Sequence, residues 1–314
     1  MFNTTIATQI YAKICFEATN SQKKIIENLS EYLSDDDFSR IFVLNGFAGT
    51  GKTTLIAALV AALKELRIKP VLLAPTGRAA KVLARYCGEQ ALTIHKRIYR
   101  QRTNADYESK FSLDFNREQG AVFIVDEASM LSDSTGDGAL FGSGSLLEDL
   151  VSYVRSGRSC RLILVGDSAQ LPPVGCDFSP ALDPATVSRY GEVVYGLMDE
   201  VVRQQMQSGI LFNATLVRCM LENRIYEIPK FEMDYPDFES VEGGDFMEKL
   251  QDAFDRYGRD EVIVITQDNK FSYYDRTRHE FAPTRPMQQG RYADILEMVL
   301  DDEGNLWSFS RKGI

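Results

Sequence analysis

The segment Gly46-Phe47-Ala48-Gly49-Thr50-Gly51-Lys52-Thr53-Thr54 decides how the rest of the chain is interpreted. It is a complete GxxxxGK[ST] loop, with an apolar run at residues 41–44 before it and an Ala- and Leu-rich stretch at residues 52–66 after it. A strand before the loop and a helix after it form the context in which this motif binds phosphate. We therefore predict a nucleotide site whose binding residues are Gly46, Ala48, Gly49, Thr50, Gly51, Lys52, Thr53 and Thr54.

The predicted ligand is ATP with Mg²⁺. Glycines let backbone N–H groups turn toward phosphate, and the dipole of the following helix favours negative charge. Lys52 would reach the β and γ phosphates as a catalytic residue, and the Thr53 hydroxyl would hold the metal.

Apolar runs resembling the one at 41–44 recur along the chain, at residues 71–74, 122–125, 162–165 and 262–266. Each is short and unbroken, which is typical of strands buried in a parallel sheet. Helical stretches such as 52–66 and 78–85 lie between several of them. This order predicts an α/β fold with helices on both faces of a doubly wound sheet.

Two of these runs deliver polar side chains to the sheet edge where ligands bind in open α/β folds. Asp126 and Glu127 follow the run at 122–125, and Gln170 follows the run at 162–165. We expect Asp126 to hold Mg²⁺ and Glu127 to take the proton of an attacking water. Gln170 would bind the γ-phosphate or that water. The alternative, a surface turn after a strand, would explain the Gly and Pro around it but not the whole string at residues 166–174.

Composition excludes several classes of protein. The chain has 314 residues, 44% of them hydrophobic and 25% charged, which excludes a disordered, collagen-like or coiled-coil protein. No apolar run reaches the roughly 20 residues of a membrane-spanning helix. Five widely spaced cysteines without a CxxC pair favour reduced thiols over disulfides or zinc. We expect a soluble, cytoplasmic monomer with no membrane partner.

Charge is unevenly distributed along this acidic chain, whose net charge is −10. Residues 78–102 hold seven basic residues against one acidic residue, and residues 222–261 hold 13 acidic against five basic residues. The basic stretch could bind phosphates, or it could be a solvated helix face.

Six strings together resemble motifs I, Ia, Ib, II, III and IV of the RecD-like superfamily 1 DNA helicases, in order. They are residues 46–54, 74–80, 93–95, 125–130, 166–173 and 202–204. The resemblance implies a RecA-like P-loop NTPase at residues 1–225, and a linker with a partial second RecA-like domain at residues 226–314. It also implies an ATP-dependent 5′-to-3′ helicase that tracks single-stranded DNA or a single/double-strand junction, and other replication or repair proteins as partners.

The resemblance assigns roles to further residues. Gln22 would hydrogen-bond adenine, the alternative being an exposed glutamine at a helix start. Arg203 would be a catalytic arginine finger, the alternative being an arginine at the solvent edge of a helix. Pro75, Thr76, Arg78, Thr93 and His95 would contact DNA, although for His95 a packing role is an equal alternative.

An inserted subdomain is implied near residues 98–118, with a hairpin that separates strands. Its aromatic residues Tyr107, Phe111 and Phe115 could equally form a minor core.

The chain also departs from the family pattern. After the run at 262–266 we find no motif V or VI, and only 44 residues follow Lys270. We therefore expect a truncated or degenerate relative with weak ATPase activity and no unwinding by these residues alone. Two alternatives remain, an ATP-binding nucleic-acid-binding or regulatory module without unwinding activity, and a small-molecule kinase.

Overall fold

The computed structural model divides into two compact units, Met1–Tyr235 and Pro236–Ile314. The residues that it describes are 2–14, 17–103, 109–133, 141–200, 208–223, 225, 229–233, 235–238, 241, 245–258, 272–275, 280–283, 295–300 and 306–310.

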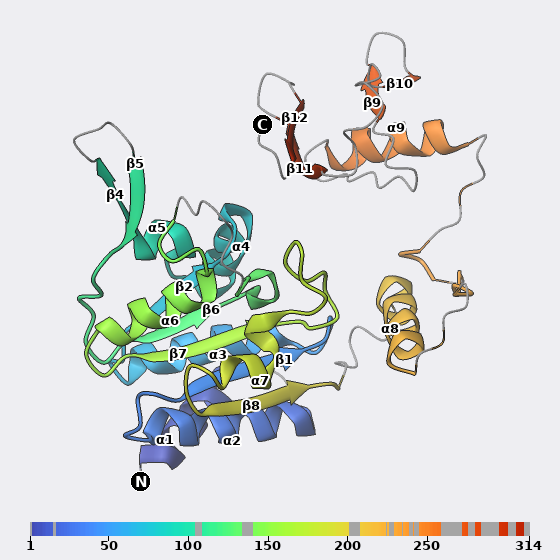
Figure 1. Cartoon of the computed structure of the whole chain (residues 1–314). Coiled ribbons are helices and arrows are strands. Elements are labelled where there is room, and N and C mark those ends of the chain that lie inside the picture. Colours follow the sequence, from blue (N-terminus) through green and yellow to red (C-terminus); the bar gives the residue numbers. More distant parts are fainter. Residues whose placement is uncertain are drawn as a thin grey trace. The chain divides into compact units, whose positions relative to one another are not determined.

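The first unit is built on a six-stranded sheet in the order β3-β2-β6-β7-β1-β8, in which every neighbouring pair is parallel (Figure 1). Its strands are β1 (Ile41–Gly46), β2 (Pro70–Ala74), β3 (Ala91–Thr93), β6 (Val122–Val125), β7 (Arg161–Gly166) and β8 (Val193–Met198). Four of them coincide with predicted apolar runs. Strand β7 lies between β1 and β6, so the loops after these three strands meet at one edge.

Helices cover both faces of this sheet, which confirms the predicted fold class. One face carries α1 (Phe2–Lys13), α2 (Asn20–Ser34), α3 (Lys52–Glu65) and α4 (Gly77–Cys87). The other carries α5 (Ile94–Ile98), α6 (Leu146–Ser156), α7 (Pro184–Val187) and the short 3₁₀ helices η1 (Ala128–Met130) and η2 (Pro180–Leu182). Alternation along β1 separates the two cores, because Phe42 and Leu44 face the first set of helices while Ile41 and Val43 face the second. Each fully buried aliphatic or aromatic side chain stabilises the sheet by about 1.5–3 kcal/mol.

An antiparallel hairpin of β4 (Tyr99–Thr103) and β5 (Ser109–Leu113) lies in the segment where the family inserts a subdomain. Phe111 stacks on Phe141 with ring centres 4.5 Å apart, and both rings pack against the hydrophobic core on the α5 and α6 face of the sheet. Phe115 is 65% exposed, and Tyr107 lies outside the described residues. The strand-separating role of the hairpin remains a prediction.

The first unit ends with α8 (Gly209–Glu222) and a connector, of which the structure describes residues 229–233 and 235. In the second unit the structure describes α9 (Phe246–Tyr257) and two antiparallel pairs. The pairs are β9 (Ser272–Asp275) with β10 (Glu280–Pro283), and β11 (Ile295–Leu300) with β12 (Leu306–Ser310). The strand expected at 262–266 lies outside the described residues, so the partial second RecA-like domain stays a prediction. None of the helices within the described ranges is both long and apolar enough to cross a membrane.

Candidate nucleotide site

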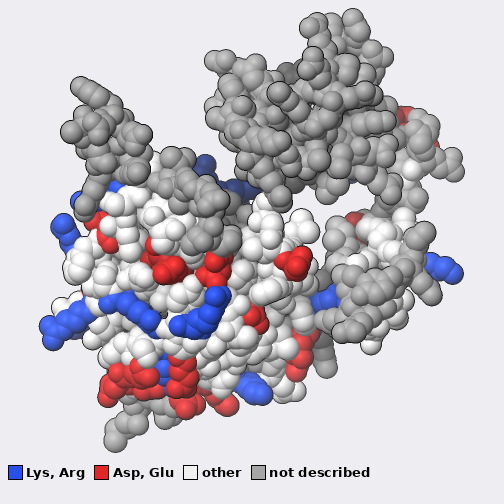
Figure 2. Space-filling model, viewed as in Figure 1, with Lys and Arg blue, Asp and Glu red and all other residues white. Residues whose placement is uncertain are grey.

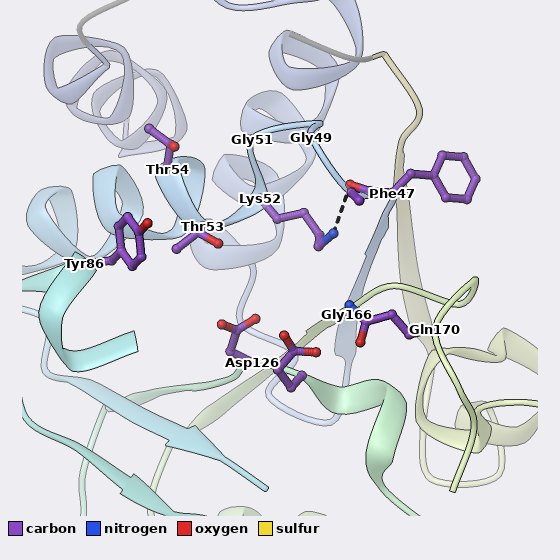
Figure 3. Close-up of a pocket in the computed structure, with 12 residues that line it drawn as sticks. Phe47, Gly49, Gly51, Lys52, Thr53, Thr54, Tyr86, Asp126, Gly166 and Gln170 are labelled. Carbon is purple, nitrogen blue, oxygen red and sulfur yellow. Dashed lines mark hydrogen bonds between the residues drawn. The ribbon is translucent and has the colours of Figure 1, made fainter. Parts of the chain in front are cut away.

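A pocket of about 300 Å³ lies at the edge where β1, β6 and β7 end (Figure 3). Its volume is at the lower end of the range for small-molecule sites. Residues from three sheet loops, from the start of α3 and from α4 line it. They are Phe47, Ala48, Gly49, Gly51, Lys52, Thr53, Thr54, Tyr86, Asp126, Glu127, Gly166 and Gln170.

The P-loop (residues 46–54) has the backbone shape that its sequence predicts. Gly49 and Gly51 have φ angles of 76° and 85°, a left-handed region that glycine adopts without steric cost. Helix α3 then begins at Lys52, so its first N–H groups are aimed at the pocket. Thr50 is fully buried and its hydroxyl donates to the Phe47 carbonyl at 2.8 Å, which holds the loop closed.

The Lys52 ammonium is bound to the P-loop itself. It donates to the carbonyl of Gly46 and, at 3.0 Å, to that of Phe47, the bond drawn dashed in Figure 3. Its Nζ also lies 4.0 Å from Oδ2 of Asp167. Burial lowers the pKa of Lys52, and Asp167, Glu127 and Asp126 oppose that shift. A phosphate would therefore find a partly desolvated cation here.

Asp126 and Glu127 lie across the pocket from the P-loop. Burial raises the pKa of both carboxyl groups, and for Glu127 the neighbouring Asp126 raises it further. Glu127 has a φ angle of 54°, a left-handed conformation that costs a non-glycine residue energy and is concentrated at functional sites. A carboxylate with a raised pKa in a pocket is suited to accept a proton near neutral pH.

The predicted metal ligands face the same space. Figure 3 shows the Thr53 hydroxyl and the Asp126 carboxylate directed toward one another across the pocket. A hydroxyl and a carboxylate are oxygen ligands of the kind that Mg²⁺ prefers when it also binds phosphates. The residues present therefore fit a magnesium ion.

Gln170 lies on the opposite side of the pocket from Tyr86, in the loop after β7. Its backbone N–H donates to the Asp167 carbonyl at 3.1 Å, and Oδ1 of Asp167 accepts from the Ala169 N–H at 2.9 Å. These bonds fold the loop so that Gln170 reaches the pocket.

Gln22 is not the exposed glutamine of the alternative interpretation, because it is only 1% exposed. Its Oε1 accepts from the Thr19 N–H at 3.0 Å in a capping box, and its Nε2 donates to the Thr50 carbonyl at 2.9 Å. Gln22 therefore joins α2 to the P-loop. It does not line the pocket, and its contact with adenine remains a prediction.

The residues predicted to contact DNA leave the sheet at the same edge as the P-loop. Strands β2 and β3 are parallel neighbours, and Ala74 at the end of β2 pairs with Thr93 at the end of β3. Thr76 and Thr93 each cap the helix that follows, accepting N–H bonds from Ala79 and Lys96. Pro75 is half-buried, and Arg78 is exposed in the first turn of α4.

His95 is half-buried among aromatic rings, 5.6 Å from the ring centre of Tyr99 and 5.1 Å from that of Phe141. Burial lowers its pKa, so the ring is neutral at pH 7 and brings no charge to DNA. These contacts favour the packing alternative, although a neutral imidazole can still hydrogen-bond.

In the folded protein, acidic side chains from other segments neutralise part of the positive charge of residues 78–102. Arg97 pairs with Glu118, and Arg100 pairs with Asp114. These acidic partners lie outside residues 78–102, so a count along the sequence misses them. Arg78, Lys81 and Arg85 are exposed on α4, and Figure 2 shows basic side chains beside that helix while acidic ones gather near α1 and α2.

Arg203 lies outside the described residues, so its role as an arginine finger remains a prediction. The structure adds four residues to which sequence reasoning gave no role, Asp167, Gly166, Tyr86 and Phe47. A glycine and an acidic residue that follow an apolar run could have indicated Gly166 and Asp167. No local signal indicates Tyr86, because α4 brings it to the pocket through the fold.

Comparison with known proteins agrees with this geometry. Residues 18–211 match the family model described as an AAA domain. The chain belongs to this family. It is 30% identical over 154 residues to "ATP-dependent RecD2 DNA helicase" of Deinococcus radiodurans, covering 49% of this chain and 19% of that protein.

A second relative is "RecBCD enzyme subunit RecD" of Mycobacterium tuberculosis, 33% identical over 201 residues, with 52% of this chain and 32% of that protein covered. A crystal structure of Pif1 helicase from Bacteroides with ADP-AlF3 and ssDNA is 16% identical, with 94% of this chain and 75% of that chain covered and a TM-score of 0.44. The chain thus spans less than a third of these two curated relatives. These relatives confirm the RecD-like resemblance, whereas the assignment of the individual motifs stays a prediction.

Proposed function

We propose that this chain is the ATPase part of an ATP-dependent DNA helicase that acts in the cytoplasm and moves 5′ to 3′ along single-stranded DNA. The observation that carries the proposal is one pocket that combines a P-loop lysine with Asp126, Glu127 and Gln170 from two neighbouring strands. Relatives named as DNA helicases support the same reading.

The described side chains suit hydrolysis of ATP. Backbone N–H groups of Gly49 and Gly51 and the start of α3 would cradle the phosphates, and Lys52 would neutralise the β and γ phosphates. Glu127 would accept the proton of the attacking water, and Gln170 would orient that water or the γ-phosphate.

Thr53 and Asp126 would hold Mg²⁺, which when bound neutralises charge on the phosphates. Arg203 would stabilise charge on the γ-phosphoryl oxygens. Gln22 would contact adenine while it keeps α2 attached to the P-loop.

DNA would lie along the edge formed by the ends of β2 and β3. Pro75, Thr76 and Arg78 would contact the backbone there, with Thr93 and His95 beside them. Backbone contacts of this kind fix the position of a strand without reading its sequence. Conformational changes driven by ATP binding and hydrolysis would then alternate grip and release of the strand.

Two rival functions give different results in one assay of phosphate release. A helicase-like chain releases phosphate faster when single-stranded DNA is added, and a binding module without turnover releases none. A kinase transfers the phosphoryl group to a small acceptor and so forms ADP without free phosphate. We expect DNA stimulation, and we expect Lys52→Ala to abolish release without unfolding the protein. Release that is unaffected by Lys52→Ala would contradict the proposal.

A further inference from the structure

Phe47 connects the nucleotide loop to a helix that the proposed mechanism does not use. Its carbonyl accepts from Lys52 Nζ at 3.0 Å, from the Thr50 N–H at 3.3 Å and from the Thr50 hydroxyl at 2.8 Å. Its ring points away from Lys52 in Figure 3. The guanidinium of Arg218, on α8, stacks over that ring with Cζ 3.8 Å from the ring centre. One residue therefore contacts both the phosphate-binding lysine and α8.

The other end of α8 is bonded to the connector. Asn213 is 3% exposed, and its side chain exchanges two hydrogen bonds of 2.8 Å with the backbone of Glu232. The rings of Phe212 and Tyr235 lie 5.7 Å apart. Gly209 packs so closely on Tyr235 that a Cβ added to it would lie 2.5 Å from the tyrosine side chain. The second unit begins at the next residue, Pro236. Helix α8 thus links the P-loop to the point where the chain leaves the first unit.

Phosphate binding changes the partners of the Lys52 ammonium. Lysine has three N–H donors, and in this structure Lys52 directs N–H groups to the carbonyls of Gly46 and Phe47. One N–H therefore remains for a phosphate, and a phosphate that recruits a second N–H weakens the charge-assisted bond to the Phe47 carbonyl. The Phe47 carbonyl would then be held by Thr50 alone, and a change in the orientation of this peptide would move the ring that contacts Arg218.

We propose that Arg218 is a positioning residue that couples the nucleotide state of the P-loop to α8 and, through Asn213, to the connector before Pro236. The inference rests on the proposed function, because it presumes a phosphate ligand at Lys52. The simpler alternative is that the Arg218–Phe47 stack only fastens α8 to the first unit. The two readings differ in whether the connector responds to nucleotide.

Hydrogen exchange distinguishes coupling from simple attachment of α8. It is measured, with and without Mg²⁺–ADP, on the peptide that contains Glu232 and Tyr235. We expect nucleotide to change this exchange rate in the wild-type chain by about 5-fold or more, the lower range of measured couplings. In Arg218→Met, which removes the planar cation, that response should be lost although the dissociation constant for fluorescent ADP stays within about 3-fold of wild type. Arg158→Met is the control of matched charge, because Arg158 is exposed before β7 at the opposite edge of the sheet.

A second variant removes the same contact without changing α8, so the test also holds if Arg218→Met loosens that helix. Phe47→Leu retains the P-loop backbone and an apolar side chain but removes the ring, so it should lose the same response. Combining both substitutions should add nothing, because they break one contact. A connector whose exchange responds normally in both variants, or ignores nucleotide in a wild-type chain that binds ADP, overturns the inference. Failure of the wild-type chain to bind ADP would instead overturn the proposed function.

Discussion

Asn45 and Ser168 are joined by two reciprocal hydrogen bonds between the end of strand β1 and the loop that follows β7. Asn45 Nδ2 donates to Ser168 Oγ at 2.8 Å, and the Ser168 N–H donates to Asn45 Oδ1 at 3.0 Å. Asn45 is 5% exposed and directly precedes the P-loop, whereas Ser168 lies two residues before Gln170. This pair therefore fixes Gln170 relative to the phosphate loop.

Replacing Asn45 with Ala should weaken both stability and catalysis. The loss of three partly buried hydrogen bonds, two with Ser168 and one with Tyr195, should lower the free energy of unfolding by about 1–3 kcal/mol, as measured by urea denaturation. The hydrolysis rate should fall further than nucleotide affinity, because Gln170 loses its support. Tyr195→Phe is the control, since it removes only the third bond of Asn45, to the Tyr195 hydroxyl at 3.0 Å. Wild-type stability in Asn45→Ala would contradict this view.

Glu127→Gln should stabilise the nucleotide-free protein at neutral pH. Burial raises the pKa of Glu127 in the folded state, so the folded protein favours the protonated carboxyl. That stabilisation is complete below the ordinary value of 4.5 and is lost as the pH rises through the higher folded pKa. Thermal melting should therefore show Glu127→Gln above wild type at pH 7.5, with the difference shrinking toward pH 4.5. If the difference in melting temperature grew as the pH fell, the pKa of Glu127 would be lowered in the folded state, which would contradict this prediction.

Arg78→Glu should weaken binding of single-stranded DNA to all sequences about equally. Arg78 is exposed at the sheet edge and would meet phosphate, which carries no base information. The slope of log affinity against log salt should fall by about 1 for the lost contact. Arg158→Glu makes the same charge change at the opposite edge and should bind nearly as wild type. Fluorescence anisotropy with two unrelated oligonucleotides measures this, and a loss confined to one sequence would argue against a phosphate contact.

Much of the fold could be predicted because its central strands are buried on both faces. The runs at 41–44, 71–74, 122–125 and 162–165 are continuously apolar, and each forms a parallel strand. The sequence did not predict β8, because this strand is the outermost of the sheet and the side chains of Tyr195 and Leu197 are exposed there. A half-exposed edge strand lacks the unbroken apolar run that identifies its neighbours.

The site could be predicted where residues act close to their own motif, and not where distant segments meet. The P-loop, Asp126, Glu127 and Gln170 line one pocket, as their places at strand ends indicated. Tertiary contacts account for the rest. Gln22 is hydrogen-bonded to Thr50, which is 28 residues away, and Glu118, the acidic partner of Arg97, is 21 residues away. Neither partner has a signature in the local sequence.

The role of Glu127 in hydrolysis is tested most directly by comparing wild type with Glu127→Gln. The rate of ATP hydrolysis is measured at saturating ATP and single-stranded DNA, and nucleotide affinity is measured in parallel. If Glu127 is the general base, the variant should bind ATP as tightly as wild type and hydrolyse it at least ~10²-fold more slowly. Wild-type turnover in Glu127→Gln, or weakened ATP binding with normal turnover at saturation, would contradict the central claim.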